Sequence, residues 1–237
     1  MTGHPRVLAL IPAYNEAASL PALVGTLRQH WRNLDILVVD DGSSDQTIAL
    51  LRELGVRWLH WPERRGVGSA LRAGLRYAAR QDYDIVVRLD ADGQHDVSDV
   101  EALLAPLYAG TADVVLGSRF PGFNSSRHPG PIQWSLGALL SIITKRTVTD
   151  PTSGFWALGR RAVALLAEHH PLGYPEPELH LFLSRNAMRV VEVDVRSRAR
   201  LHGRSSLTLS RVVAAGARVA LAMIIVPFRA IVRSTGD

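Results

Sequence analysis

Two aspartates one residue apart are the residues of this chain best suited to chemistry. Asp90-Ala91-Asp92 follows a short apolar run over residues 85–89, and Gln94 comes two residues later. Carboxylate and amide oxygens are the ligands that hard divalent cations prefer, so we expect Asp90, Asp92 and Gln94 to bind Mg²⁺ or Mn²⁺. Such a cation could bridge a diphosphate and offset the charge on a departing nucleotide. The aspartate pair alone would be explained equally well by a solvated acidic turn. The neighbouring motifs must therefore distinguish a metal site from such a turn.

Three further polar motifs stand in a comparable position, directly after a short apolar run. They cover residues 12–16, 40–43 and 117–119. The apolar runs alternate with segments of helical spacing, which predicts right-handed βαβ units and a mostly parallel sheet. In such a sheet the carboxyl ends of the strands share one edge, where ligands bind. Four polar strand ends at one edge therefore predict a binding site.

The elements that must position these motifs follow from the same periodicity. Strands are predicted over residues 7–11, 36–39, 57–60, 85–89, 114–117 and 190–195. Helices are predicted over about residues 18–29, 44–54, 68–80, 98–108, 134–144, 160–168 and 179–185. A long loop rich in Gly, Pro and Ser is predicted at residues 121–133, and a turn at 150–155. The fold class is therefore α/β, with no clear linker between two domains.

The composition excludes several classes of protein and favours others. The chain has 237 residues, of which 47% are hydrophobic, enough for the core of one large domain. It has no cysteine, which excludes disulfides, thiolate catalysis and cysteine-ligated zinc. The net charge of +5 favours phosphate-bearing partners, but no nucleic-acid-binding motif accompanies it, so we expect no nucleic-acid partner. Residues 1–5 do not resemble the start of a signal peptide, and we expect a cytoplasmic protein.

The order of these motifs resembles the family 2 glycosyltransferases, which have the GT-A fold. Within that group the chain is most similar to polyprenol-phosphate sugar synthases of the dolichol-phosphate mannose synthase type. Three more segments carry this likeness: Gly117-Ser118-Arg119-Phe120, Asp150-Pro151-Thr152-Ser153-Gly154-Phe155, and Arg200 with Gly203-Arg204-Ser205-Ser206-Leu207. The resemblance covers nearly the whole chain. It implies a Rossmann-like catalytic domain over residues 1–206, followed by a tail over residues 207–237.

The resemblance also implies roles for single residues. For the nucleotide these are Pro12, Ala13, Tyr14, Glu16, Asp40, Asp41, Asp90 and Ala91. For the metal they are Asp90, Asp92 and Gln94, and Asp92 and Arg119 are the expected catalytic residues. For the acceptor or its phosphate they are Arg119, Ser153, Arg200, Arg204 and Ser205. Guanidinium groups suit this last role because they bind phosphate through two parallel hydrogen bonds.

The chain departs from the family pattern at two places. Ser206 stands where the family usually has lysine, which removes one cation, and a segment with two glutamates, Glu176 and Glu178, replaces a more apolar stretch. If the acceptor is a hydroxyl, either glutamate could act as general base and so join the catalytic residues. A phosphate acceptor is already ionised and needs no base. Alternatively, Pro175 and Pro177 shape a turn and one glutamate caps the helix that follows.

The C-terminal segment over residues 212–232 is strongly apolar but carries charge. Arg218 and Arg229 lie inside it, and Arg211 and Arg233 flank it. At ~100° per residue they fall within about 60° of one another on a helix, which predicts a helix lying in a membrane interface with arginines toward lipid phosphate. The alternative is a helix packed on the core or on a second subunit. A membrane partner protein could also supply the anchoring.

These inferences together predict one reaction. The protein is expected to be an inverting, metal-dependent glycosyltransferase, peripheral on the cytoplasmic membrane face. It would move a sugar from a UDP-, GDP- or dTDP-linked donor to a polyprenyl-phosphate acceptor. One alternative keeps the donor chemistry and uses a hydroxyl acceptor with Glu176 or Glu178 as base. Another is a scaffold that binds a nucleotide-sugar without catalysis.

Overall fold

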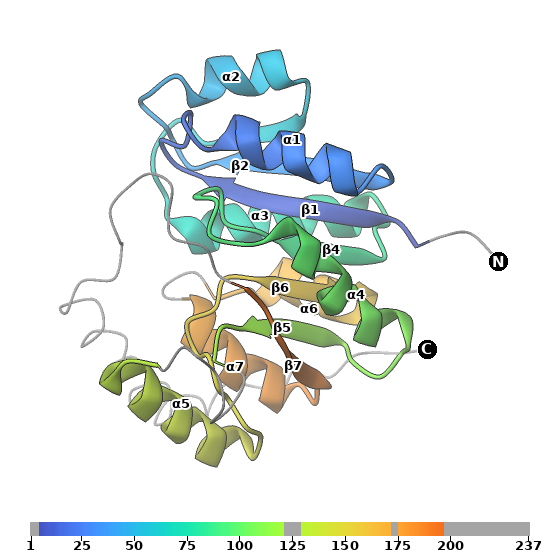
Figure 1. The fold of residues 1–237 in the computed structure, drawn as a ribbon, viewed down its shortest axis with the longest axis vertical. Coiled ribbons are helices and arrows are strands. Elements are labelled where there is room, and N and C mark those ends of the chain that lie inside the picture. Colours follow the sequence, from blue (N-terminus) through green and yellow to red (C-terminus); the bar gives the residue numbers. More distant parts are fainter. Residues whose placement is uncertain (1–4, 121–128, 172–174, 197–237) are drawn as a thin grey trace.

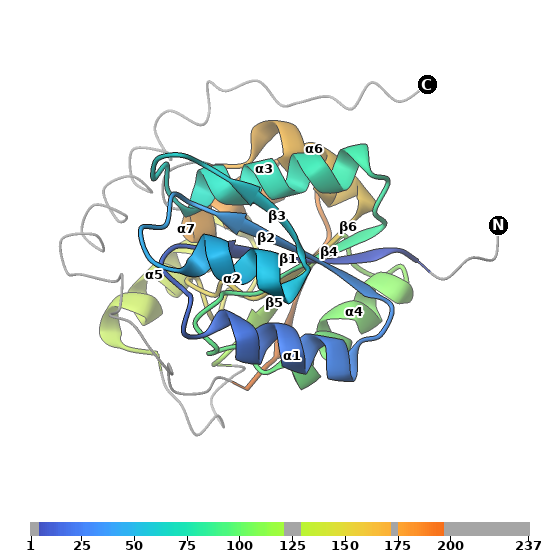
Figure 2. The same cartoon turned by 90° about the horizontal axis from the view of Figure 1, so that it is seen from above.

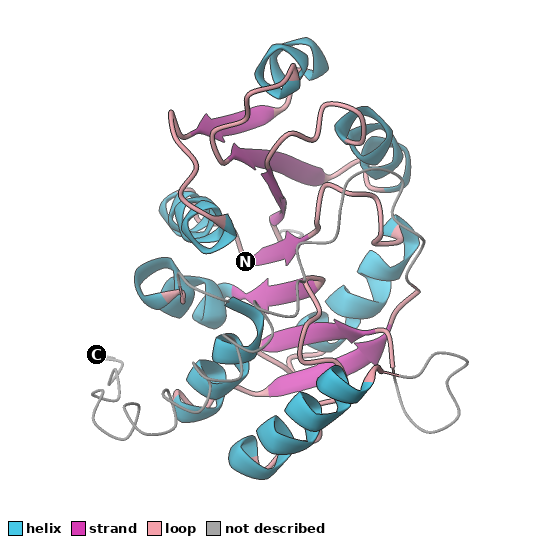
Figure 3. Cartoon of the chain, turned by 90° about the vertical axis from the view of Figure 1, so that its left-hand side faces the viewer, coloured by secondary structure: helices cyan, strands magenta, loops and turns pink. Residues whose placement is uncertain are grey.

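Strands alternate with helices along the part of the chain that the computed structural model describes, which is residues 5–120, 129–171 and 175–196. They form a seven-stranded sheet in the order β3-β2-β1-β4-β6-β5-β7 (Figure 1). Helices cover both sides of the strands, as the view from the side shows (Figure 3). The predicted α/β class is confirmed.

The strands and helices have the following bounds. The strands are β1 (Val7–Ala13), β2 (Leu34–Asp40), β3 (Arg57–His60), β4 (Ile85–Arg88), β5 (Val114–Ser118), β6 (Trp156–Gly159) and β7 (Val190–Asp194). The helices are α1 (Leu20–His30), α2 (Thr47–Leu54), α3 (Val67–Arg80), α4 (Val100–Tyr108), α5 (Pro131–Thr144), α6 (Arg160–His169) and α7 (Pro175–Arg185). A short 3₁₀ turn, Val97–Asp99, precedes α4.

All strands of this sheet except β6 run in the same direction. β1 pairs in parallel with β2 and β4, β2 with β3, and β5 with β7. β6 runs antiparallel to both of its neighbours, β4 and β5. The carboxyl ends of the parallel strands therefore share one edge with the amino end of β6, and the four polar motifs lie at this edge as predicted.

Apolar layers fill both faces of the sheet. Along β1, Ala9 and Ile11 pack on the side of α1 and α4, whereas Leu8 and Leu10 pack on the side of α3 and α6 (Figure 2). Because helices cover both faces, six of the seven residues of β1 are buried and its sequence is a continuous apolar run. This packing fixes the strand ends, and with them the loops that carry the polar motifs.

The structure corrects the prediction at three elements. β6 was not predicted. It has only four residues and leads directly into α6, and a segment this short shows no hydrophobic periodicity by which a strand could be distinguished from a turn. α7 begins at Pro175, so Pro175 and Pro177 lie in its first turn and not in a separate turn before it. α5 begins at Pro131, inside the predicted loop over residues 121–133. Prolines suit these helix starts, because the first-turn amides have no partner within the helix.

Some predictions fall outside the described residues. These are the phosphate-binding roles of Arg200, Arg204 and Ser205, the helix over residues 212–232, and the boundary at residues 206/207. Among the residues that are described, no helix is both long and apolar enough to cross a bilayer.

Candidate active site

The loops after β1 and β2 are tied to each other by hydrogen bonds. The Asn15 amide N–H donates to the Ser43 hydroxyl at 2.8 Å, and the Ser44 N–H donates to the Asn15 side-chain oxygen at 2.8 Å. The guanidinium of Arg64 lies 3.9 Å from the ring centre of Tyr14. The motif over residues 12–16 is therefore held in a fixed position beside the second strand end, with the Tyr14 ring stacked under a cation.

Two buried aspartates at the end of β2 shape the neighbouring loops. The Asp41 carboxylate accepts the main-chain N–H groups of Arg65 and Gly66, each at 2.8 Å. The Asp40 carboxylate accepts the Ser43 N–H at 3.1 Å and also contacts the His60 ring at 2.9 Å. Both aspartates are thus built into the loop structure, and direct contact with a nucleotide stays a prediction for them.

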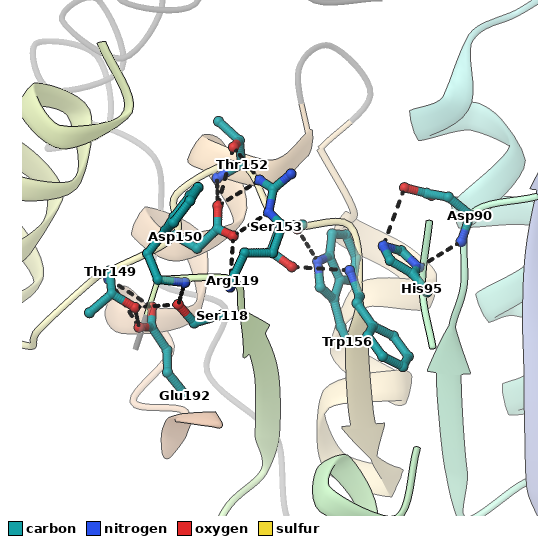
Figure 4. A network of polar contacts seen from close by, with 12 residues as sticks. Asp90, His95, Ser118, Arg119, Thr149, Asp150, Thr152, Ser153, Trp156 and Glu192 are labelled. Carbon is teal, nitrogen blue, oxygen red and sulfur yellow. Dashed lines mark hydrogen bonds and ion pairs between the residues drawn. The ribbon is translucent and has the colours of Figure 1, made fainter. Parts of the chain in front are cut away.

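The acidic turn after β4 is tightly organised. Asp92 is only 7% exposed, and its carboxylate accepts the Gln94 N–H at 3.0 Å. The Asp90 N–H donates to His95 Nδ1 at 3.1 Å, and the His95 ring stacks on Phe155 with 4.6 Å between ring centres (Figure 4). Burial lowers the pKa of His95 and outweighs the nearby carboxylates of Asp90 and Asp92. The ring is therefore neutral at pH 7, and its Nδ1 can accept the Asp90 hydrogen bond.

The donor set of this turn fits a divalent cation that also binds its substrate. No group of three or more His, Cys, Asp or Glu residues among the described positions could hold a metal alone. Mg²⁺ commonly uses one or two carboxylates and completes its coordination with substrate phosphates and water, which the Asp90 and Asp92 carboxylates match. A side chain at Gly154 would clash with Asp90 and Arg88, so this glycine leaves the Asp90 carboxylate its space.

Arg88 is a site residue that the sequence analysis missed. Its side chain is 4% exposed, and it donates to Asp90 Oδ1 and to Glu176 Oε1, each at 3.0 Å. The guanidinium also lies 4.4 Å from the ring centre of Trp156. Burial acts to lower the pKa of Arg88, but the carboxylates of Asp90 and Glu176 outweigh it and raise that pKa above its ordinary value. A charged residue inside the apolar strand β4 was the available signal, because a buried charge requires a partner.

The two glutamates of α7 have different environments. Glu176 is largely buried and bonded to Arg88, and burial raises its pKa despite that contact. Glu178 is half-buried in the same first turn. The structure thus brings Glu176 into the cluster around Asp90, where it binds Arg88.

Arg119 lies just beyond β5 in a network with the loop before β6. Its Nε and Nη2 donate to the two oxygens of Asp150 at 2.6 and 2.9 Å, and Nη2 also donates to the Thr152 hydroxyl at 2.9 Å (Figure 4). The bond to Asp150 raises the pKa of Arg119, and the charges of Asp90 and Asp92 act in the same direction. The guanidinium therefore remains cationic beside the acidic turn.

The loop that carries Asp150 is fixed at both ends. The Thr149 N–H donates to the Glu192 carboxylate at 3.0 Å, which joins the loop to β7 (Figure 4). Ser153 accepts the Phe155 N–H at its hydroxyl, and its carbonyl accepts the Trp156 indole N–H at 2.7 Å. Ser153 therefore shapes the turn into β6, and its predicted contact with the acceptor phosphate stays a prediction.

The predicted residues fall into two adjoining groups at the sheet edge. The residues at the ends of β1 and β2 are Pro12, Ala13, Tyr14, Glu16, Asp40 and Asp41. The residues around the ends of β4 and β5 are Asp90, Ala91, Asp92, Gln94, Arg119, Ser153 and Glu176, joined by Arg88, His95 and Asp150. The arrangement offers carboxylates for a cation beside guanidinium groups for phosphate.

This strand order, with an acidic turn after β4, is that of the GT-A class of glycosyltransferases. The model of the family described as glycosyl transferase family 2 matches residues 9–165, and the chain belongs to this family. The protein is therefore a glycosyltransferase.

Named relatives align with most of the chain. An undecaprenyl-phosphate mannosyltransferase of Micrococcus luteus is 34% identical over 216 residues, which cover 86% of this chain and 88% of the relative. A UDP-N-acetylglucosamine–dolichyl-phosphate N-acetylglucosaminyltransferase of Methanococcus voltae is 30% identical over 216 residues, covering 81% and 85%. The predicted similarity to polyprenol-phosphate sugar synthases is confirmed.

A solved structure shows the same fold. The crystal structure of glucosyl-3-phosphoglycerate synthase from Mycobacterium tuberculosis, in complex with Mn²⁺, UDP-glucose and phosphoglyceric acid, superposes with a TM-score of 0.70 at 24% identity. The match covers 94% of this chain and 79% of the other.

Proposed function

We propose that this glycosyltransferase moves a sugar from a nucleotide-diphosphate donor to a polyprenyl phosphate. One observation carries the proposal: the relatives from M. luteus and M. voltae, each aligned over more than four-fifths of both chains, are named for polyprenyl-type phosphate acceptors. The names of these two relatives give different sugars, so the proposal specifies neither the sugar nor the nucleotide of the donor.

We propose that the donor binds at the loops after β1, β2 and β4. The half-buried Tyr14 ring, with Arg64 stacked on it, offers a planar surface for the base. Asp90 and Asp92 would hold Mg²⁺ or Mn²⁺, which offsets negative charge on a diphosphate leaving group when bound. Arg88 fixes the Asp90 carboxylate from the buried side.

We propose that the acceptor phosphate binds at Arg119. The guanidinium is charged, partly exposed and aligned by Asp150. In a single displacement, an acceptor phosphate oxygen bonds to the anomeric carbon as the bond to the diphosphate breaks on the opposite face, which inverts that carbon. The attacking oxygen carries no proton at pH 7, so no general base is required. Glu176, bonded to Arg88, then serves as a positioning residue.

A hydroxyl acceptor is the second candidate, and one observation favours it. Burial raises the pKa of Glu176, which is a property of carboxylates that transfer protons. Replacement of the base by Glu176→Gln would then lower kcat about 10²-fold or more. With a phosphate acceptor, a change below about tenfold is expected at unchanged acceptor preference.

The protein is further proposed to work at the cytoplasmic membrane face. A polyprenyl phosphate is held in a bilayer, and the apolar, arginine-bearing sequence over residues 212–232 suits the lipid interface. Attachment through a membrane partner protein or a second copy of this chain would serve the same purpose.

The test is release of nucleoside diphosphate from a panel of UDP-, GDP- and dTDP-sugars with undecaprenyl phosphate and Mn²⁺. We expect turnover that depends on the lipid and falls about 10²–10³-fold in Asp92→Asn, as when a group that stabilises transition-state charge is lost. Glu101→Gln, at an exposed carboxylate on α4, is the matched control and should keep full activity. Undiminished activity of Asp92→Asn would exclude the metal role, and turnover only with a hydroxyl acceptor would exclude the lipid phosphate.

A further inference from the structure

A network of hydroxyl groups joins β7 to the end of β5, beside the candidate site. The Thr149 hydroxyl donates to the Glu192 carboxylate at 2.5 Å, and the hydroxyl oxygens of Thr149 and Ser118 lie 2.6 Å apart (Figure 4). The Phe120 main-chain N–H donates to the Ser118 hydroxyl oxygen at 3.1 Å. The side chains of Glu192, Thr149 and Ser118 together are named the β7 network here. None of the three is among the residues expected to touch the donor or the acceptor.

The hydrogen bonds of the β7 network have a single direction. Both oxygens of the Glu192 carboxylate accept the Thr149 N–H, at 3.3 and 3.0 Å. The Thr149 hydroxyl has one proton, and it donates this proton to Glu192. Its oxygen therefore accepts the proton of Ser118, whose own oxygen accepts the Phe120 N–H. The network thus stabilises one arrangement of three segments, which are the end of β5, the loop before β6, and β7.

The β7 network holds the residues that adjoin Arg119 and its partner. Ser118 precedes Arg119, Phe120 follows it, and Thr149 precedes Asp150. The buried Asp150 carboxylate accepts the Arg119 main-chain N–H at 3.2 Å, in addition to the guanidinium. The direction in which the guanidinium points therefore depends on where the network holds this loop.

Main-chain pairing does not replace the β7 network. β5 and β7 form a parallel ladder over Val114–Ser118, which attaches β7 to the sheet but does not include the loop with Thr149 and Asp150. Burial raises the pKa of Glu192, so its charged form is costly at this position, and the hydrogen bonds from Thr149 offset that cost. The carboxylate of Glu192 therefore serves to hold the loop.

We propose that Glu192 is a positioning residue for the acceptor phosphate and acts through the β7 network on Arg119. The proposal rests on the proposed function, in which Arg119 binds that phosphate. A guanidinium makes two parallel hydrogen bonds to phosphate only when its plane is correctly oriented, and small misplacements of such groups lower the rate strongly. Loss of the network should therefore weaken use of the acceptor, whereas the donor residues at the ends of β1, β2 and β4 keep their contacts.

Thr149→Val tests the proposal on the full chain, because valine has nearly the shape of threonine and lacks only the hydroxyl. We expect the KM for undecaprenyl phosphate to rise about tenfold, as for the loss of one hydrogen bond to a charged group. The KM for the nucleotide-sugar, taken from the panel of UDP-, GDP- and dTDP-sugars, should be unchanged. Thr149→Ser keeps the hydroxyl and should restore the acceptor KM. Equal rises of both KM values, or no rise of either, would overturn the proposal.

A double-mutant cycle shows whether Glu192 acts through Thr149. Glu192→Gln should raise the acceptor KM to a similar extent as Thr149→Val, and the double variant should raise it no further, because both changes interrupt the same network. Additive effects would mean that Glu192 does not act through this hydroxyl, which would overturn the proposal.

Tyr83→Phe is the matched control, because it also removes a hydroxyl that donates to a carboxylate. Tyr83 donates to Asp35 at 2.6 Å near the start of β2, at the edge of the sheet opposite the site. This variant should lose stability in urea denaturation as Thr149→Val does, but keep the acceptor KM of the natural chain. An equal rise of the acceptor KM in both variants would show a general effect of reduced stability and overturn the proposal.

Hydrogen exchange at Arg119 separates this proposal from the proposed function. The Nε–H of Arg119, which donates to Asp150 at 2.6 Å, is assigned in NMR spectra by its loss in Arg119→Lys. It should exchange about tenfold faster in Thr149→Val and at the natural rate in Tyr83→Phe. An unchanged rate in Thr149→Val would overturn the proposal with any acceptor. If the natural chain does not turn over undecaprenyl phosphate, the proposed function fails instead, and the exchange rate alone decides whether the network orients Arg119.

Discussion

At the end of β2 a buried carboxylate is held by main-chain amides, whereas beside β4 and β5 two carboxylates pair with guanidinium groups. Asp41 belongs to the first kind, with the N–H groups of Arg65 and Gly66. Asp150 and Glu176 belong to the second, with Arg119 and Arg88. An amide cannot leave its position without moving the loop, so the first arrangement fixes backbone. A guanidinium retains its charge and further donors, so the second can also bind phosphate. The difference between Asp41 and Asp150 follows the proposed division between the nucleotide and the acceptor.

The largest effect is expected for Arg88→Met, which removes a buried cation from two carboxylates. The free energy of unfolding should fall by about 3–5 kcal/mol, because Asp90 and Glu176 are left with uncompensated charge. Urea denaturation measures this change. The double variant with Glu176→Gln should recover part of the loss. A double variant less stable than the single one would show that the pairing with Glu176 does not matter.

A pH effect of similar size is expected in the second half of the molecule. Burial lowers the pKa of His170 to about 4 and that of His180 to about 3. In the unfolded chain both histidines bind a proton near pH 6.5, whereas in the folded chain they stay neutral until the pH is much lower. The free energy of unfolding is therefore unaffected by these two groups above pH 6.5, and it decreases as the pH falls from 6.5 toward 4. Each histidine contributes a slope of up to about 1.4 kcal/mol per pH unit, or about 2–4 kcal/mol for both between pH 7 and pH 5.

Urea denaturation from pH 7 to pH 4.5 measures this slope, in the natural chain and in the double variant His170→Gln/His180→Gln. The double variant should show a clearly shallower dependence. An unchanged slope would mean that both rings accept protons in the folded chain.

Asp41→Asn tests the first arrangement. Asparagine keeps one oxygen acceptor but loses the charge and the second acceptor for Arg65 and Gly66, so a loss of about 1.5–3 kcal/mol in unfolding free energy is expected. The affinity for the donor nucleotide, followed by calorimetry with UDP, GDP and dTDP, should fall with it. Unchanged affinity at reduced stability would restrict Asp41 to a structural role.

The smallest effect is expected for Arg119→Lys, which keeps the charge and removes the forked contact to Asp150 and Thr152. The kcat/KM for the lipid acceptor should fall about tenfold, or about 1.4 kcal/mol, while nucleotide affinity is unchanged. Equal losses for donor and acceptor would remove the proposed division of the site.

The strands that carry the polar motifs could be predicted from the sequence. Short apolar runs that alternate with segments of helical periodicity are compatible with few folds other than a parallel α/β sheet. β6 could not be predicted, because its four residues give no periodicity, and its insertion between β4 and β5 depends on contacts distant in sequence. For the same reason the sequence placed Arg119 and Asp150 in separate motifs without showing that they form a pair.

The candidate site shows the same pattern. Motif residues such as Asp90, Asp92 and Arg119 were identified from their types and positions at strand ends. Arg88 was missed because β4 was treated as an apolar strand, although a charge in its interior indicates a buried partner. That partner, Glu176, is far away in sequence and is brought close by the start of α7 at Pro175.

The antiparallel strand β6 has a consequence for synthesis of the chain. The sheet of β3-β2-β1-β4 joins the pair β5-β7 only through Trp156–Gly159, within the described residues. A nascent chain that has not yet released these residues from the ribosome exposes the hydrogen-bonding edge of β4, and such an edge pairs readily with other chains. Fragments that end before residue 156 should therefore aggregate in translation, whereas fragments that extend past β7 should be soluble.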